Sequence, residues 1–223
     1  MSKVSVGRLP RTRVPLPEHV LALGYTGTHG PANGLDAVLD AALVLKRRGI
    51  DDVAFVLVGD GREKARLERR AADEGLDNVV FLGLFNKSEY NQLLAELDAG
   101  MQILANVPAF YYGTSPNKFF DYLAVGKPVL VNYPGWMSDL VAEHDCGVAV
   151  APDDPEAFAD AVLALRARRA ELERMGRAGR ELAESRFRQQ KILVDLARFV
   201  ETFDPAFVGP DRAVAETVGD GRR

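Results

Sequence analysis

Short apolar runs alternate with segments of helical periodicity along most of this chain, and this alternation restricts the fold more than any other feature. The run VAFVLV has no polar position, which is typical of a strand covered on both faces of its sheet. Because strands that alternate with helices form right-handed βαβ units, we predict an α/β fold with a doubly wound, mostly parallel sheet and helices on both faces. Strands are predicted at residues 20–25, 53–58, 79–82, 101–104, 129–131 and 147–150.

Helices are predicted between these strands from apolar positions spaced three or four apart and from glycines that end them. We expect Ser88 to cap its helix, Pro155 to open another at the favoured first position, and the chain to form a long loop up to Tyr112. The last two helices form a C-terminal extension. The helical segments run from Gly34 to Gly49, from Gly61 to Gly75, over 89–97 and 116–125, onward from Pro155, and over 171–186 and 189–203.

The length of 223 residues suits one domain, which we place at 20–203, after an entry segment at 1–19 and before a loose tail at 204–223. A net charge of −4 argues against nucleic acid as a partner. The longest apolar runs are too short to span a bilayer, and the amino terminus lacks the apolar stretch of a secretory signal. Because Cys146 is the one cysteine, the chain has no internal disulfide, and we predict a cytoplasmic protein.

Residues 166–180, RARRAELERMGRAGR, are strongly basic, and two interpretations stay open for them. The first is a solvated helix face with acid–base pairs, the usual behaviour of mixed charge runs. The second is a patch that meets acidic lipid headgroups or a protein partner. The second interpretation predicts peripheral contact with the inner face of a membrane.

The glycine-rich segment GYTGTHG at 24–30 follows the first predicted strand and precedes a helix. Glycines there allow backbone amides to approach a phosphate, and a doubly wound sheet binds ligands at the carboxyl ends of its strands. The alternative is that these glycines serve only to turn the chain. The spacing differs from GxGxxG, which disfavours binding of NAD. We expect the second glycine pair, GDG at 59–61, to form a structural turn in which Asp60 caps a helix.

A third segment, YGTSPNKFFDYLAVGKPV at 112–129, is the most informative. A loop of glycine, threonine and serine runs directly into a helix, whose unpaired first amides attract an anion. Lys118 on the first turn is unfavourable for the helix alone, and a bound anion would resolve that conflict. Asp121, one turn later, could accept the hydroxyls of a ribose or sugar; a surface Lys118–Asp121 pair is the alternative. The histidines and the cysteine have no metal spacing, and no cofactor is predicted.

Taken in order, several strings resemble the C-terminal, donor-binding domain of retaining glycosyltransferases of family 4 with the GT-B fold. They are YTGTHGPANGLD, FVLVGDGREKARL, NVVFLGLFNKSEY, SPNKFFDYLAVGKPVL, CGVAVAPDDPEAFADAV and MGRAGRELAESRF, and they cover nearly the whole chain. The SPNKFFDYLAVGKPVL string is most similar to the branch that makes bacterial surface polysaccharides.

The resemblance implies that the start of the 116–125 helix binds the donor diphosphate, with Lys118 stabilising the leaving group. Asp121 would hold the ribose hydroxyls, while the first acid of that family motif is replaced by Gly113. The arginine and lysine of the first loop are replaced by His29 and Asn33. The expected donor-binding residues are Gly27, Asn33, Leu84, Phe85, Thr114, Ser115, Pro116, Asn117, Lys118 and Asp121.

The resemblance also implies a reaction. A hexosyl or amino-sugar residue would pass with retention from a UDP- or GDP-linked sugar to a glycan or lipid-linked acceptor. A complete enzyme of this type has an N-terminal acceptor-binding half, which we expect to be missing here or supplied by a separate chain. The alternative is a non-catalytic nucleotide-sugar-binding module. A sugar-nucleotide epimerase is disfavoured because the family strings differ.

Overall fold

The computed structural model describes residues 11–202, so most of the entry segment and the tail predicted at 204–223 lie outside the described residues. The chain divides into two compact units, one that ends at Ala183 and one that begins at Glu184. The division of the chain into three segments stays a prediction. The first unit holds the sheet and all the residues discussed below as a site.

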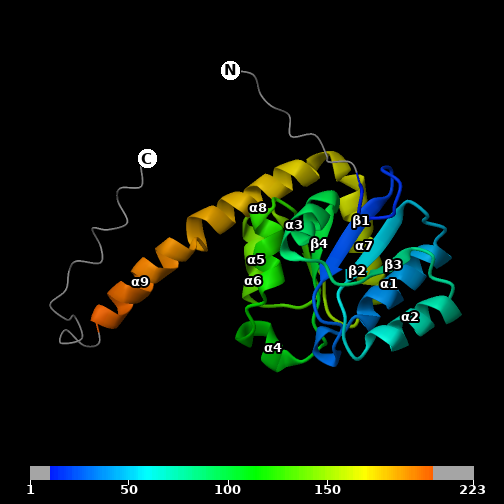
Figure 1. The fold of residues 1–223 in the computed structure, drawn as a ribbon, viewed down its shortest axis with the longest axis horizontal. Coiled ribbons are helices and arrows are strands. Elements are labelled where there is room, and N and C mark those ends of the chain that lie inside the picture. The colour runs from blue at the N-terminus through cyan, green and yellow to red at the C-terminus, as the bar shows by residue number, and fades with distance from the viewer. Residues whose placement is uncertain (1–10, 203–223) are drawn as a thin grey trace, which may run out of the picture. The chain divides into compact units, whose positions relative to one another are not determined.

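The first unit is built on a sheet of six parallel strands in the order β3-β2-β1-β4-β5-β6 (Figure 1). The predicted α/β class is confirmed, and the sheet is wholly parallel in the described part of the chain. Strand order reverses between β1 and β4, which is where a doubly wound sheet opens a ligand crevice. The strands are β1 (Leu21–Thr26), β2 (Val53–Val58), β3 (Val79–Leu82), β4 (Ala99–Gln102), β5 (Val129–Val131) and β6 (Gly147–Ala149).

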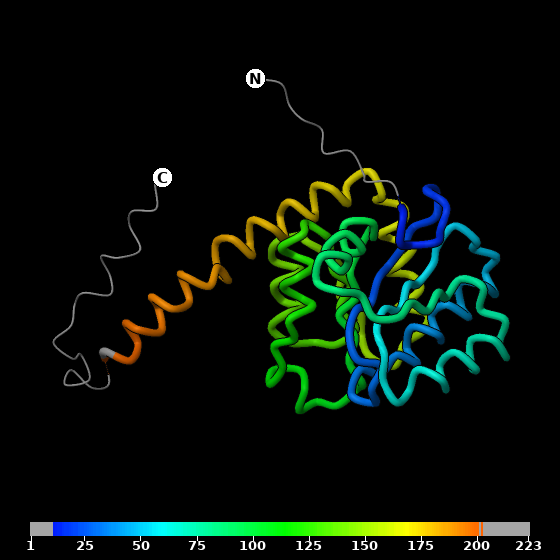
Figure 2. The backbone as a smooth tube through the Cα atoms, viewed as in Figure 1, coloured from blue at the N-terminus to red at the C-terminus, as the bar shows by residue number. Residues whose placement is uncertain are grey.

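Helices cover both faces of this sheet (Figures 1 and 2). In the views, α1, α2 and α7 lie on one side of the sheet, and α5 and α6 lie on the other. The helices of the first unit are η1 (Pro31–Asn33), α1 (Asp36–Arg47), α2 (Lys64–Asp73), α3 (Lys87–Glu96), α4 (Pro108–Gly113), α5 (Asn117–Ala124), α6 (Trp136–Glu143), α7 (Pro155–Ala167) and η2 (Arg169–Glu171). They are followed by α8 (Leu172–Arg186) and by α9 (Gln189–Glu201), the predicted helical extension.

The core lies between the sheet and these helices. Every residue of β1 and of β2 is buried, as the apolar run VAFVLV predicts. Leu39 and Leu45 of α1 are fully buried, and Phe55 of β2 meets Phe158 of α7 edge to face at 6.2 Å. Burying such side chains is the main driving force that holds the strands in register beneath the site.

Two α-helices of the described residues were not predicted. The expected loop up to Tyr112 contains α4, whose Pro108 occupies the first helical turn, and α6 follows Gly135, which has φ +128°. The cap of α3 was placed wrongly, because Asn86 accepts from the amides of Ser88 and Glu89 and forms a capping box. The side-chain oxygen of Asn86 accepts hydrogen bonds from two amides of the first turn of α3. Ser88 lies inside that turn, so its hydroxyl is not in the position of the cap.

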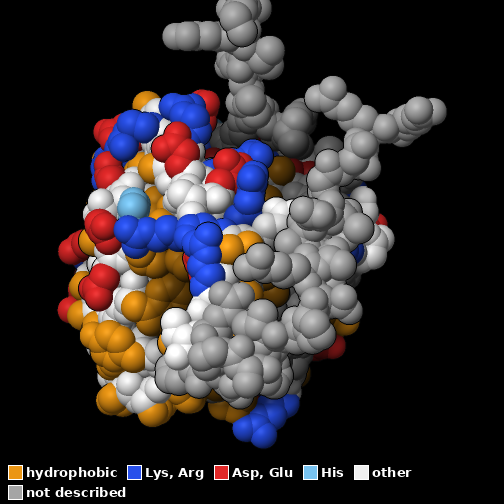
Figure 3. Space-filling view, turned by 90° about the vertical axis from the view of Figure 1, so that its left-hand side faces the viewer, with side chains coloured by type: hydrophobic (Ala, Val, Ile, Leu, Met, Phe, Trp, Pro, Cys, Tyr) orange, Lys and Arg blue, Asp and Glu red, His pale blue; other side chains and the backbone are white. Residues whose placement is uncertain are grey.

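Five arginines of the basic stretch form ion pairs, namely Arg166, Arg168, Arg169, Arg174 and Arg177. Arg166 bonds Asp52 at 2.7 Å, and Arg174 bonds Asp145 at 2.6 Å. Figure 3 likewise shows acidic groups beside basic groups on the face that it displays. These pairs favour the interpretation as a solvated, ion-paired face, and membrane contact stays a prediction. No helix within residues 11–202 is long and apolar enough to cross a membrane.

Candidate functional site

An open crevice of about 400 Å³ lies at the carboxyl end of β1, beside the point where strand order reverses. It unites segments that are far apart in the sequence, because parallel strands deliver their following loops to the same edge of the sheet. Six of the predicted residues line it, together with three that the sequence analysis did not select. The predicted six are Gly27, Asn33, Pro116, Asn117, Lys118 and Asp121, and the additional three are Thr26, Thr28 and Tyr90.

Lys118 is the central charge of the crevice. Its Nζ lies 3.9 Å from the centre of the Tyr25 ring and 3.4 Å from Oδ1 of Asn33. No carboxylate of the described residues forms an ion pair with it, and the alternative of a Lys118–Asp121 surface pair is not what the structure contains. Burial lowers the pKa of the Lys118 ammonium to about 7, because the charged form loses hydration without gaining an opposite charge.

Gly27 lies directly beneath the lysine side chain. A Cβ on Gly27 would stand 3.3 Å from both Cε and Nζ of Lys118, and the residue has φ +140°, which side chains rarely allow. The absence of a side chain therefore lets Lys118 cross the loop. The side-chain amide nitrogen of Asn33 donates to the carbonyl of Thr28 at 2.8 Å, so that Oδ1 of the same side chain faces Lys118.

The loop after β2 supports the loop after β1 from behind. A Cβ on Gly59 would lie 2.0 Å from the carbonyl oxygen of Gly27, and one on Gly61 would lie 2.5 Å from that of His29. The structural role predicted for this turn is thus confirmed. The cap predicted for Asp60 is wrong, since its carboxylate accepts from the amide of Gly61 while α2 begins at Lys64.

His29 lies inside the protein instead of at the crevice. Its side chain has no exposed surface and packs against the rings of Tyr25 and Phe81. Burial lowers the pKa of the imidazole, and the neighbouring Lys64 lowers it further. A contact between this side chain and a bound phosphate is therefore excluded in this conformation, and the residue acts as a small core group beneath the loop.

Asp121 reaches the crevice from the second turn of α5. Its Oδ2 accepts a hydrogen bond of 3.1 Å from the hydroxyl of Tyr90, which comes from α3. The same hydroxyl lies 3.0 Å from Oγ1 of Thr26, at the end of β1. Thr26 lies in GYTGTHG and Tyr90 ends the string NVVFLGLFNKSEY, but sequence reasoning gave neither side chain a role, because the local pattern does not show which side chains meet across the fold.

The remaining predicted residues lie outside the lining of this crevice. The hydroxyl of Thr114 donates to the carbonyl of Phe110 at 2.7 Å, so it serves the end of α4, and Ser115 is exposed to solvent. Leu84 and Phe85 follow β3, where the side chain of Leu84 is 80% exposed. Their proposed contact with a nucleobase stays a prediction.

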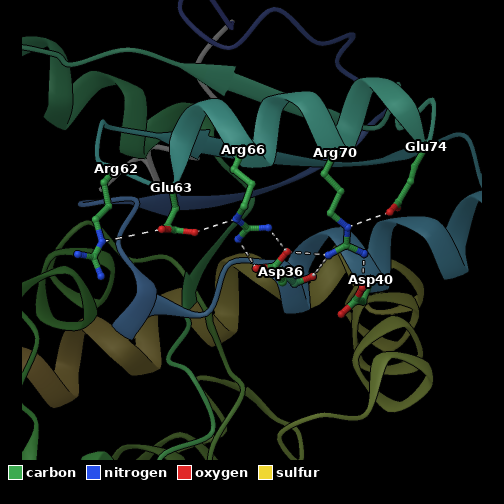
Figure 4. Close-up of polar contacts among 7 residues, drawn as sticks. All are labelled: Asp36, Asp40, Arg62, Glu63, Arg66, Arg70 and Glu74. Carbon is green, nitrogen blue, oxygen red and sulfur yellow. Dashed lines mark hydrogen bonds and ion pairs between the residues drawn. The ribbon is translucent and has the colours of Figure 1, made fainter.

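Charged side chains join the two helices that follow the glycine loops (Figure 4). Asp36 in the first turn of α1 accepts from Arg66 at 2.9 Å and from Arg70 at 2.8 Å, both on α2. Arg70 also bonds Asp40 of α1 and Glu74, the residue that follows α2. The network fixes α1 and α2 relative to each other, and thereby the loop after β1, which lines the crevice, and the loop after β2, which supports it.

Comparison with known families identifies the family of this domain. Residues 20–168 match the family model described as glycosyl transferases group 1. The chain belongs to this family. Among its relatives, the D-rhamnosyltransferase WbpZ of Pseudomonas aeruginosa is 32% identical over 166 residues, which cover 74% of this chain and 40% of WbpZ. The resemblance stated from the sequence strings is therefore confirmed.

A second relative is the GDP-mannose-dependent α-(1-6)-phosphatidylinositol monomannoside mannosyltransferase of Mycobacterium tuberculosis. It is 29% identical over 185 residues, 79% of this chain and 46% of the relative. This group 1 glycosyltransferase chain spans less than half the length of the curated relatives it matches.

Solved structures give the same fold. The C-terminal domain of LpcC, a group 1 glycosyltransferase from Francisella tularensis, matches with a TM-score of 0.62 at 19% identity, over 76% of this chain and 87% of that domain. Anabaena HepE, solved with UDP and glucose, matches with a TM-score of 0.68 at 21% identity, over 82% of this chain and 48% of HepE. The fold is that of the C-terminal domain of a GT-B glycosyltransferase.

Proposed function

We propose that this domain binds the nucleotide-sugar donor of a glycosyltransferase, with the donor diphosphate in the crevice at the start of α5. The observation that carries the proposal is the position of Lys118. A partly buried ammonium that faces an open crevice, beside a side-chain-free Gly27 and without a carboxylate partner among the described residues, is matched to an anion that arrives from solution. The two phosphate groups of a nucleoside diphosphate are such an anion.

The first turn of α5 adds to this attraction. Its amides point out of the amino-terminal end of the helix, where the helix dipole is positive. Asn117 and Lys118 line the crevice at that end, and Pro116 precedes them without capping the helix by a side chain. Together these groups would stabilise the charge that grows on the diphosphate as the glycosidic bond to it breaks.

Asp121 is proposed to accept the hydroxyl protons of the nucleoside ribose, and the chain at Leu84 and Phe85 to border the base. UDP and GDP are the candidate carriers. HepE, of the same fold, was solved with UDP, and the mycobacterial relative is named as GDP-mannose-dependent.

The proposed reaction is transfer of a hexosyl or amino-sugar residue, with retention, to a glycan or lipid-linked acceptor. The acceptor must be held beside the donor so that the two reacting atoms meet in a defined orientation. Since this chain spans less than half the length of its relatives, we propose transfer for the domain acting together with an acceptor-binding domain. The donor-binding step belongs to this domain itself.

Titration calorimetry with UDP, GDP, UDP-glucose and GDP-mannose tests the donor-binding step. We expect one nucleotide series to bind, and Lys118→Ala to weaken that binding at least tenfold, about 1.4 kcal/mol. Lys191→Ala is the matched control, because Lys191 of α9 is an exposed lysine that pairs with Asp195 at 2.7 Å. Absence of binding to all four compounds, or equal effects of the two substitutions, would contradict the proposal.

A further inference from the structure

A chain of hydrogen bonds runs from the buried interior to Asp121. Oδ2 of Asp121 accepts from the Tyr90 hydroxyl at 3.1 Å, and that hydroxyl lies 3.0 Å from Oγ1 of Thr26. Oγ1 of Thr26 lies 3.0 Å from the hydroxyl of Tyr122, whose oxygen accepts from the Thr26 amide at 2.9 Å. The chain thus links α3, the end of β1 and α5.

The direction of every bond in this chain follows from the number of protons available, because a hydroxyl group donates one. Tyr90 uses its proton on the carboxylate, so the hydroxyl of Thr26 must donate to Tyr90. The proton of Thr26 is then used, so Tyr122 must donate to Thr26. Each hydroxyl donates once and accepts at least once, and a chain ordered in this way strengthens its terminal bond to the carboxylate.

The buried end of the chain is fixed by packing. Tyr122 is fully buried, and its ring lies so close to Gly100 of β4 that a Cβ there would be 2.3 Å from the ring. Thr26 is 3% exposed and is held in the ladder between β1 and β2. The hydroxyl of Tyr90 is therefore directed by groups that cannot rotate away.

We propose that Tyr90 is the positioning residue of this site, holding Oδ2 of Asp121 so that the other carboxylate oxygen is presented to the hydroxyls of a ribose. This inference rests on the proposed function, in which Asp121 binds the ribose. Tyr90 is suited to it because it lines the same crevice as Asp121 and Lys118. Burial raises the pKa of its hydroxyl to about 12, so the group remains a donor at neutral pH.

The geometry explains how a carboxylate can discriminate between a ribose and a deoxyribose. An aspartate that rotates freely can turn towards water or towards Lys118, which its carboxylate would neutralise. Fixed by Tyr90, it keeps one oxygen occupied and offers the other in a constant direction. Preorganisation of this kind increases affinity for the ligand whose hydroxyls match that direction.

The test compares UDP with 2′-deoxy-UDP, and GDP with 2′-deoxy-GDP, by titration calorimetry on the wild-type chain and on Tyr90→Phe. We expect the wild type to prefer the ribonucleotide by about tenfold. Tyr90→Phe should lose most of this preference because ribonucleotide binding weakens by about tenfold while deoxynucleotide binding changes little. Tyr112→Phe, which removes the hydroxyl of an exposed tyrosine, should keep the preference.

A second pair of variants separates positioning from general damage to the fold. Asp121→Asn should abolish the preference, and Tyr90→Phe added to Asp121→Asn should change it no further, because both act through one carboxylate. The inference is overturned if the Tyr90→Phe variant keeps the preference for the ribonucleotide, or binds both nucleotides more weakly by the same factor. It is also overturned if the effects of Tyr90→Phe and Asp121→Asn on binding are additive. If the wild type binds neither UDP nor GDP, the proposed function fails as well; failure confined to the variants overturns the role of Tyr90 alone.

Discussion

The ammonium nitrogen of Lys118 lies 3.9 Å from the centre of the Tyr25 ring, above a loop whose Gly27 leaves room for the lysine side chain. The aromatic face stabilises the cation by its quadrupole, and Asn33 adds a carbonyl oxygen at 3.4 Å. These contacts direct the lysine without neutralising it. The cation is thus prepared for a ligand that brings the opposite charge.

Proton uptake is the first prediction. A pKa of about 7 for Lys118 implies that its side chain is uncharged in about half of the free protein molecules near pH 7. A bound diphosphate favours the charged form and raises this pKa, so binding takes up a proton and the affinity should fall as pH rises from 7 to 9. Calorimetry with UDP-glucose or GDP-mannose, whose diester phosphates do not titrate in this range, should show heats that depend on the ionisation enthalpy of the buffer.

Lys118→Met provides the control for this linkage. The variant lacks the titrating group, so its residual binding should be independent of pH over the same range. An affinity of the wild type that stays constant from pH 7 to 9, with no buffer-dependent heat, would show that Lys118 is already charged in the free protein. The low pKa that we assign to Lys118 on the ground of its burial would then be wrong.

Gly27→Ala is the second prediction. The residue has φ +140°, a conformation that costs a residue with a side chain about 1–3 kcal/mol. The new methyl group would also press on Cε and Nζ of Lys118 from 3.3 Å and turn the ammonium away from the crevice. We expect lower stability in denaturant unfolding together with weaker nucleotide binding.

Gly30→Ala in the same loop is the comparison for Gly27→Ala. A Cβ on Gly30 would meet its nearest neighbours at 3.6 and 3.8 Å, which are ordinary contact distances, and its φ is −114°. Binding should therefore stay near the wild-type value. Equal loss of binding in both variants would mean that any added methyl group disturbs the loop, and that the passage of Lys118 over Gly27 is not decisive.

The sequence determines much of this arrangement by local rules. VAFVLV could be placed on a buried strand because every position is apolar, and Lys118 could be singled out because a cation opposes the helix dipole at the start of α5. Both inferences need only neighbours in the chain. The order of the strands then brings GYTGTHG and SPNK to the same edge of the sheet.

Residues that act across the fold were beyond these rules. Tyr90 meets Asp121 although the two are 31 residues apart, and the chain between them contains β4 and α4. Tyr90 ends the string NVVFLGLFNKSEY, but nothing in that string indicates which residue its hydroxyl meets. The burial of His29 was beyond them for a related reason: a loop histidine is usually exposed, but the turn at Gly59 and Gly61 lets the second loop close over this one.

The ion-pair network of Figure 4 gives the third prediction, Asp36→Asn. Hydrogen bonds from Arg66 are the main cause that lowers the pKa of Asp36 below its ordinary 3.8, with Arg70 contributing. The carboxylate therefore stabilises the folded state above pH 3.8, and this contribution is lost as pH falls through the lowered folded-state pKa. Because the side chain is 42% exposed, we expect a loss of only about 1 kcal/mol at pH 7, reduced by salt.

Urea unfolding at pH 7 and at pH 2.5 measures this contribution. The difference between wild type and Asp36→Asn should be present at pH 7 and smaller at pH 2.5. Glu173→Gln is the control, since Glu173 makes one exposed pair with Arg177 within α8 and should cost less. A difference for Asp36→Asn that does not change with pH would assign its effect to something other than the charge.

The last prediction concerns the support of α5 from the side away from the crevice. Gly176 of α8 rests against the turn that follows α5, where Gly126 has φ +72°. A Cβ on Gly176 would lie 1.8 Å from the carbonyl oxygen of Gly126, so Gly176→Ala must separate α8 from that turn. We expect a loss of about 2–3 kcal/mol in the free energy of unfolding. Gly113→Ala, with nothing within 4 Å of the added methyl group, should be nearly neutral, and equal stability of the two variants would contradict the tight contact between α8 and this turn.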